Sequence, residues 1–116
     1  GWIDAEQKAK LLSQADMFIL PSYAEGLPIS ILEAMSYRLP ILSTRVGGIP
    51  AIVTHEKNGL LIKPGDKIAL WDSLQRMINE PKMRNSMGEI SYEKVQSHFP
   101  ENVCTTLERI YTALLR

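Results

Sequence analysis

The sequence predicts an α/β fold built on a small parallel sheet of about three strands. Short apolar runs alternate with helical patterns along the N-terminal part of the 116-residue chain, and this alternation is typical of βα units that form parallel sheets. The C-terminal part carries only helical patterns, so we expect a helical tail. The composition is 45% hydrophobic and 22% charged, which is ordinary for one small globular domain.

The first predicted elements are a helix, a strand and a second helix. Asp4 is a good N-cap residue, and apolar positions at helical spacing follow it, so we expect a helix from Ala5 to Gln14 with a solvated charged face. Met17 to Leu20 is a short apolar run stopped by a proline, which indicates a buried strand. The next helix is expected from Ile29 to Tyr37, with Pro28 near its first turn, where a missing N–H costs little.

Two strands and four further helices follow in the prediction. The remaining expected elements are the strands Pro40–Thr44 and Leu60–Ile62, a short helix Ile49–Thr54, a helix Lys67–Asn79 capped by Asp66, a helix from Pro81 and a final amphipathic helix. In the helix before Pro81, five apolar residues are expected to share one face, namely Leu70, Trp71, Leu74, Met77 and Ile78. The strand Met17–Leu20 has no predicted neighbour on one side, and we predict a homodimer or aggregation through this exposed edge.

The stretch from Pro21 to Met35 carries the clearest functional signal. It spans a strand end, a loop and a helix start, which is where ligands bind in open α/β sheets. Glu25 lies in the loop and Glu33 eight positions on, in the second helical turn. A carboxylate only accepts hydrogen bonds, so both suit the paired hydroxyls of a ribose or a hexose. Gly26 allows close backbone approach, and the free N–H groups at the helix start suit phosphate, so together they match a nucleotide-sugar.

A second loop, Val46-Gly47-Gly48-Ile49-Pro50, follows another predicted strand. Its two glycines have two interpretations that the loop alone supports equally, a tight turn or close backbone approach to a ligand. Because the loop is expected beside the Glu25 loop, we predict that Gly47 and Gly48 contact the ligand.

These motifs together resemble the E-x7-E region of retaining GT-B-fold glycosyltransferases of family-4 type, the "glycosyl transferases group 1" domain. A bare E-x7-E spacing arises often by chance, whereas an ordered set of matching motifs is specific. The set comprises Ala15-Asp16, Phe18-Ile19-Leu20-Pro21-Ser22, Glu33-Ala34-Met35, Leu39-Pro40-Ile41, Val46-Gly47-Gly48-Ile49-Pro50, Asn58-Gly59-Leu60-Leu61 and Pro64-Gly65-Asp66. The chain departs from the family pattern at Arg38, usually glycine, and at Ala51, commonly glutamate. If the helix ends in a left-handed cap, Arg38 takes a positive φ.

The resemblance implies a partial Rossmann-like fold, a three-layer α/β/α arrangement that forms the C-terminal part of the donor-binding domain of a GT-B enzyme. Residues 1–116 would be a single domain and a fragment of a longer protein. The full enzyme would transfer a hexosyl-type sugar from a nucleotide-diphospho-sugar to a hydroxyl acceptor with retention. The fragment is expected to be inactive alone, because the family's basic Arg and Lys belong to the part of the domain ahead of Gly1. The N-terminal GT-B domain of the full chain is an expected partner.

The resemblance also assigns roles to residues of the first loop and helix. Glu33 would bind the ribose hydroxyls, and Glu25 would contact the donor sugar and act as the catalytic residue. The other expected substrate contacts are Gly26, Leu27, Pro28 and Ile29. No cofactor or metal is expected, and His55 and His98, the two histidines, have no metal-ligand spacing.

Composition excludes several other classes of protein. The formal net charge is zero, which argues against a nucleic-acid binder. The single cysteine, Cys104, excludes an internal disulfide and suits a reducing compartment. No apolar run approaches ~18 residues, so no transmembrane span is expected. The resemblance implies a cytoplasmic enzyme of cell-surface polysaccharide biosynthesis, with peripheral association of the full enzyme at the inner membrane face.

Two other functions are consistent with the sequence. The first is a non-catalytic nucleotide- or sugar-binding or interaction module derived from the same fold, which the departures at Arg38 and Ala51 favour and the two glutamates oppose. The second is a GT-B-like sugar-nucleotide epimerase, although the loop that contains Glu25 fits transferases better.

Overall fold

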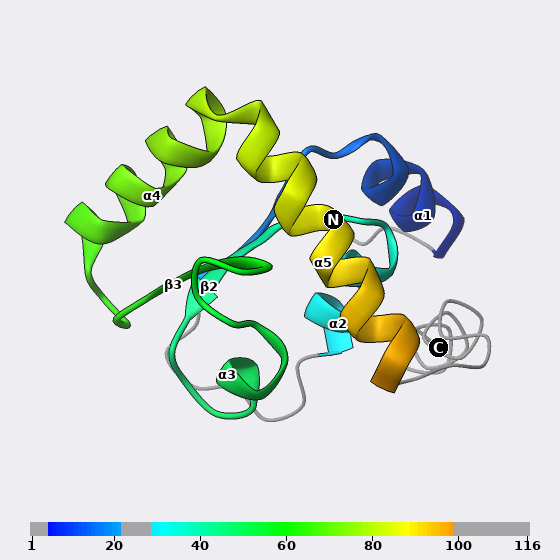
Figure 1. The fold of residues 1–116 in the computed structure, drawn as a ribbon, viewed down its shortest axis with the longest axis horizontal. Coiled ribbons are helices and arrows are strands. Elements are labelled where there is room, and N and C mark those ends of the chain that lie inside the picture. The colour runs from blue at the N-terminus through cyan, green and yellow to red at the C-terminus, as the bar shows by residue number, and fades with distance from the viewer. Residues whose placement is uncertain (1–4, 22–28, 99–116) are drawn as a thin grey trace.

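The structure, a computed structural model, describes residues 5–21 and 29–98 and has the predicted α/β fold (Figure 1). Its three parallel strands are β1 (Phe18–Leu20), β2 (Ile41–Thr44) and β3 (Gly59–Ile62), in the sheet order β1-β2-β3. Its helices are α1 (Ala5–Gln14), α2 (Ile29–Ser36), α3 (Ile49–Ile52), α4 (Lys67–Asn79) and α5 (Pro81–His98). The predicted final helix lies outside the described residues.

Both faces of the sheet carry apolar strand residues, as is typical of parallel strands buried under helices. Side chains alternate along each strand, so Ile41 and Leu42 of β2 point to opposite faces of the sheet. The first hydrophobic cluster joins Ile41 and Leu61 to α2, α3 and α5, and its other members include Ile31, Met35, Ile49, Val53 and Val95. The second cluster joins the opposite face to α4 and α5, and its buried members are Leu42, Leu60, Ile62, Met77 and Met87.

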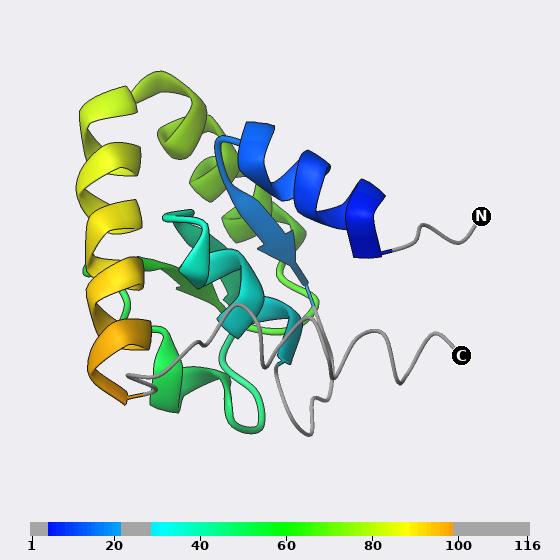
Figure 2. The ribbon, with the colours of Figure 1, turned by 90° about the vertical axis from the view of Figure 1, so that its right-hand side faces the viewer.

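Helix α5 contributes to both clusters. Val95 belongs to the first cluster and Met87 to the second. Figures 1 and 2 show α5 running from the end of α4 past the sheet towards α2. The contact with α2 is close, because a Cβ on Gly88 would lie 2.2 Å from the carbonyl oxygen of Arg38. A glycine is therefore required where α5 crosses the end of α2.

The turn after α2 confirms the positive φ predicted for Arg38, which is 61°. The N–H groups of Arg38 and Leu39 donate to carbonyl oxygens of the last helical turn, in the pattern of a Schellman cap. The guanidinium of Arg38 lies 3.8 Å from the ring centroid of Tyr92, and its Nε lies 3.2 Å from Oε1 of Glu89. These contacts with α5 offset the cost of a left-handed conformation at a residue that carries a Cβ.

The helix predicted from Lys67 to Asn79 is confirmed as α4, but the five apolar residues predicted to share one of its faces are not all buried. Met77 is buried, whereas Trp71 is 63% and Ile78 54% exposed. Strand β1 lies at an edge of the described sheet with Ile19 38% exposed, and pairing through this edge stays a prediction.

Within residues 5–21 and 29–98, no helix is long and apolar enough to cross a bilayer.

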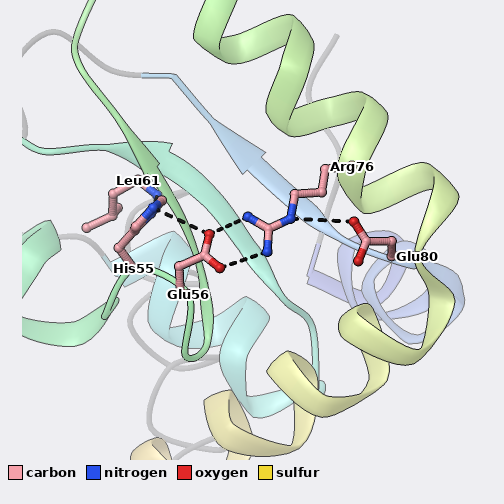
Figure 3. A network of polar contacts seen from close by, with 5 residues as sticks. All are labelled: His55, Glu56, Leu61, Arg76 and Glu80. Atoms are coloured by element: carbon pink, nitrogen blue, oxygen red, sulfur yellow. Dashed lines mark hydrogen bonds and ion pairs between the residues drawn. The ribbon is translucent and has the colours of Figure 1, made fainter.

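A polar network connects the loop before β3 to α4 (Figure 3). The guanidinium of Arg76 donates two hydrogen bonds to the carboxylate of Glu56, one of them 2.7 Å long, and its Nε lies 3.5 Å from Glu80. Nδ1 of His55 accepts a 2.9 Å hydrogen bond from the N–H of Leu61, so the ring proton sits on Nε2, 3.5 Å from Glu56. Hydrogen bonding from Arg76 holds the pKa of Glu56 below its ordinary value of 4.5.

We expect Arg76→Gln to lower the free energy of unfolding by less than about 1 kcal/mol near neutral pH, because the pair is exposed. The folded-state pKa of Glu56 is depressed, so the stabilisation is present above its unfolded value of 4.5 and is lost as pH falls through the folded pKa. Urea unfolding of wild type and R76Q from about pH 7 to pH 3 measures the effect. The control is R45Q, which removes another exposed arginine. A difference between wild type and R76Q that is constant over this pH range would contradict the prediction.

Candidate functional site

The carboxyl ends of the three strands meet at one edge of the sheet, because the strands are parallel. The predicted loop residues Glu25, Gly26, Leu27 and Pro28 lie outside the described residues. The described flanks of this segment are Pro21, directly after β1, and Ile29, the first residue of α2. The segment therefore connects the carboxyl end of β1 to the amino end of α2, as the sequence predicts for a ligand-binding loop.

The side chain of Glu33 is buried between α2 and α1. The residue is 4% exposed, and its Oε2 lies 3.6 Å from Nζ of Lys8. Burial lowers the pKa of Lys8 from its ordinary value of 10.5, and the attraction of the Glu33 carboxylate opposes this change. The predicted glutamate is thus held as one half of an ion pair that is shielded from water.

The sequence interpretation of the first helix as having a solvated charged face is wrong at Lys8. Lys8 lies one helical turn before Leu12, which is buried in the first cluster, so both residues lie on the face that packs against α2. The four-residue spacing between Lys8 and Leu12 is the signal in the sequence that places Lys8 on the packed face of the helix. The other lysine of the helix, Lys10, is exposed.

The composition of α2 explains why Glu33 is buried. All residues from Ile31 to Ser36 are buried, and a helix that is apolar on most of its circumference packs inside the fold. A buried carboxylate needs a counter-charge or hydrogen bonds, and Lys8 supplies the counter-charge.

The second predicted loop forms a tight turn. Gly47 has a φ of 53°, in the left-handed region. The N–H of Val46 donates to the carbonyl oxygen of Thr44 at 3.0 Å, and the N–H of Ile49 donates to that of Val46 at 3.1 Å. These hydrogen bonds lead β2 into α3, which is only four residues long. The turn explains the glycine at position 47, whereas Gly48 has a φ of −82°, which any residue adopts. Ligand contact by Gly47 and Gly48 stays a prediction.

A cavity of about 220 Å³ opens at the same edge of the sheet, on the face that α4 covers. It is lined by Pro21, Thr44, Ile62, Gly65, Asp66, Lys67 and Leu70. Asp66 caps α4 as predicted, because its Oδ1 accepts a 2.9 Å hydrogen bond from the N–H of Ala69. Neither Glu33 nor the two glycines after β2 line this cavity. Sequence analysis missed it because its walls come from the ends of all three strands and the start of α4.

The described part of the site offers acceptors and shape rather than a metal centre. In residues 5–21 and 29–98, no group of three or more His, Cys, Asp or Glu side chains is arranged to hold a metal ion. An ionised, desolvated carboxylate gives strong hydrogen bonds to hydroxyl groups, and this is the chemistry that Glu33 can supply.

Comparison with known proteins identifies the family. The family model described as "Glycosyl transferases group 1" matches residues 1–94. This chain belongs to that family. Its α/β fold with a small parallel sheet matches the Rossmann-like neighbours with the GT-B fold.

Two proteins that are similar to this chain come from Bacillus. N-acetyl-alpha-D-glucosaminyl L-malate synthase of Bacillus anthracis is 34% identical over 93% of this chain and 29% of its own length. The putative teichuronic acid biosynthesis glycosyltransferase TuaC of Bacillus subtilis is 35% identical over 85% of this chain and 25% of its own length. The chain thus spans less than a third of either relative.

The structure of sucrose-phosphate synthase from Thermosynechococcus elongatus has the same fold over this region. It superposes on 99% of this chain with a TM-score of 0.82 and 33% sequence identity. The superposed region is 29% of the synthase chain. The fold described above therefore matches a segment of the larger synthase chain.

Proposed function

We propose that this chain is part of a retaining GT-B glycosyltransferase of family-4 type and forms part of the site for a nucleotide-diphospho-sugar donor. The full protein would transfer a hexosyl unit to a hydroxyl acceptor. Family membership supports this proposal, as does the name of the Bacillus subtilis relative, which is a putative glycosyltransferase. The donor would be bound at the carboxyl edge of the sheet, where the β1–α2 segment lies.

The observation that carries the proposal is the placement of Glu33. This carboxylate lies in the second turn of the helix that follows β1, is 4% exposed and is paired with Lys8. Burial of a carboxylate costs free energy unless the charge is paired or accepts hydrogen bonds. The two hydroxyl groups of a ribose are donors that suit such a carboxylate. Glu25 would contact the donor sugar, and the segment from Gly26 to Ile29 would meet the sugar or phosphate.

The two departures from the family pattern have local explanations. Arg38 forms the cap of α2 and contacts Tyr92 and Glu89 of α5, so its side chain has a structural role. Ala51 is exposed on α3. Neither departure removes Glu33, so they give little support to a module that has lost donor binding.

Glu33→Gln tests the proposal in the full-length protein that contains this chain. We expect it to weaken binding of UDP or GDP by about 10- to 100-fold, because a neutral amide replaces a charged acceptor of two hydroxyl hydrogen bonds. Isothermal titration with each nucleotide measures the change. Glu93→Gln is the matched control, since Glu93 is an exposed carboxylate on α5. Unchanged nucleotide affinity in E33Q, or no binding by wild type, would contradict the proposal.

A further inference from the structure

Lys8 and Glu33 form an ion pair between two helices that are well separated in sequence. The Nζ of Lys8 lies 3.6 Å from Oε2 of Glu33, and their side chains are 21% and 6% exposed. This is unlike the exposed pair of Arg76 and Glu56, whose side chains are 41% and 44% exposed. The pair is therefore less screened by solvent than the surface pairs of the molecule.

Lys8 is the charged group that faces Glu33 from the elements packed around α2. Strands β1 and β2, which contact α2, contain no titratable side chain. On α5, Lys94 donates hydrogen bonds to the Ile52 carbonyl and the Thr54 hydroxyl, and Glu89 pairs with Arg38. Helix α2 itself contains no other acidic or basic residue. Among the described residues, the charge of Glu33 is thus balanced from α1.

The pair does little for stability in itself. Burial disfavours the charged form of Lys8 enough to lower its pKa despite the nearby carboxylate. Partly buried ion pairs often contribute no more to stability than an apolar pair of the same shape. Removal of Lys8 alone, however, leaves a buried carboxylate that becomes protonated at a higher pH than the same carboxylate paired with Lys8. The specific effect of Lys8 is therefore on the charge and position of Glu33.

We propose that Lys8 is a positioning residue for donor binding, which keeps the Glu33 carboxylate ionised and fixed in orientation so that it accepts hydrogen bonds from the donor's ribose hydroxyls. The inference rests on the proposed role of Glu33. Lys8 acts through Glu33 and does not itself touch the donor. Helix α1, which precedes β1, thus becomes part of the donor site.

The test is the pH dependence of nucleotide affinity in the full-length protein. UDP and GDP are titrated into wild type, Lys8→Gln and Lys8→Arg from about pH 5.5 to 8.5. In K8Q we expect affinity to fall about tenfold for each pH unit below the raised pKa of Glu33, since the ionised fraction falls by that factor, and to recover above it. K8R keeps the charge and should restore the wild-type profile. Lys10→Gln, an exposed lysine on the same helix, is the matched control.

The other possible outcomes would overturn the role proposed for Lys8. A pH-independent loss in K8Q would mean a merely structural role and would overturn the proposal, as would an unchanged affinity in K8Q. No nucleotide binding by wild type would overturn the proposed function and the donor role of Lys8 with it. Binding by wild type that E33Q abolishes and K8Q leaves intact overturns the role of Lys8 alone.

A second measurement does not depend on nucleotide binding. The ¹³C shift of the Glu33 carboxyl carbon, followed by NMR as pH is changed, reports its protonation directly. We expect Glu33 to titrate at a higher pH in K8Q than in wild type and K8R. Titration at the same pH in all three would show that Lys8 does not hold the charge, and would overturn the proposal even if K8Q were less stable.

Discussion

Gly88→Ala is expected to destabilise the protein by about 2 kcal/mol or more, against the direction that helix propensity predicts. In an ordinary helix interior this substitution stabilises by about 1 kcal/mol, because glycine has the larger conformational entropy in the unfolded chain. Here the new Cβ would lie 2.2 Å from the carbonyl oxygen of Arg38 and 3.0 Å from its carbonyl carbon. Both atoms belong to the backbone of the cap of α2, so no side-chain rotation relieves the overlap.

Urea or thermal unfolding of wild type and Gly88→Ala measures this effect. Ser86→Ala is the matched control, because Ser86 is an exposed residue in the same helix and its replacement should stabilise by a few tenths of a kcal/mol. A Gly88→Ala protein at least as stable as wild type would show that α5 does not approach the end of α2 as closely as described.

Asn58→Ala is the second substitution with a large expected effect, a loss of about 2–4 kcal/mol in the free energy of unfolding. Asn58 is fully buried and its Oδ1 accepts a 2.8 Å hydrogen bond from the N–H of Thr54. The Nδ2 of Asn58 donates to the carbonyl oxygen of Ile52 at 3.2 Å. The Ser91 hydroxyl of α5 donates to the main-chain carbonyl oxygen of Asn58 at 3.3 Å. Alanine removes the hydrogen-bond partners of the Thr54 N–H and of the Ile52 carbonyl oxygen, and it leaves a fully buried position partly empty.

Chemical denaturation of Asn58→Ala gives the change in stability directly. Asn79→Ala, at the exposed end of α4, is the matched control and should change stability by less than about 0.5 kcal/mol. Equal small effects of the two substitutions would mean that the buried hydrogen bonds of Asn58 are replaced by water in solution.

Much of the fold was predictable, because strands and helices here follow simple local patterns. The limits of α1 and α4 are as predicted, and the Asp66 cap and the positive φ of Arg38 are confirmed. The predicted strand Leu60–Ile62 begins one residue too late, because Gly59 is the first residue of β3, and the sequence does not show that Asn58 is buried. Such errors arise where tertiary contacts decide a residue's environment, since a turn signal does not show what packs against it.

The candidate site was predictable only in part. The position of Glu33 after β1 follows from the order of elements, but its burial and its partner depend on how α1 packs on α2. The cavity at the strand ends depends on three separate segments and on α4. Contacts between distant segments leave no periodic pattern in the sequence. The cavity and the ion pair of Lys8 are therefore visible only in the folded structure.

The position of α5 in the chain also has a consequence for biosynthesis. Both hydrophobic clusters contain residues of α5, the last described element to leave the ribosome. From the synthesis of Ile62 to that of His98, about 2 to 7 s pass at ~5–20 residues per second. During that interval the completed strands lack the helix that covers part of both faces. Apolar surface that is exposed in this way makes an incomplete chain prone to aggregate.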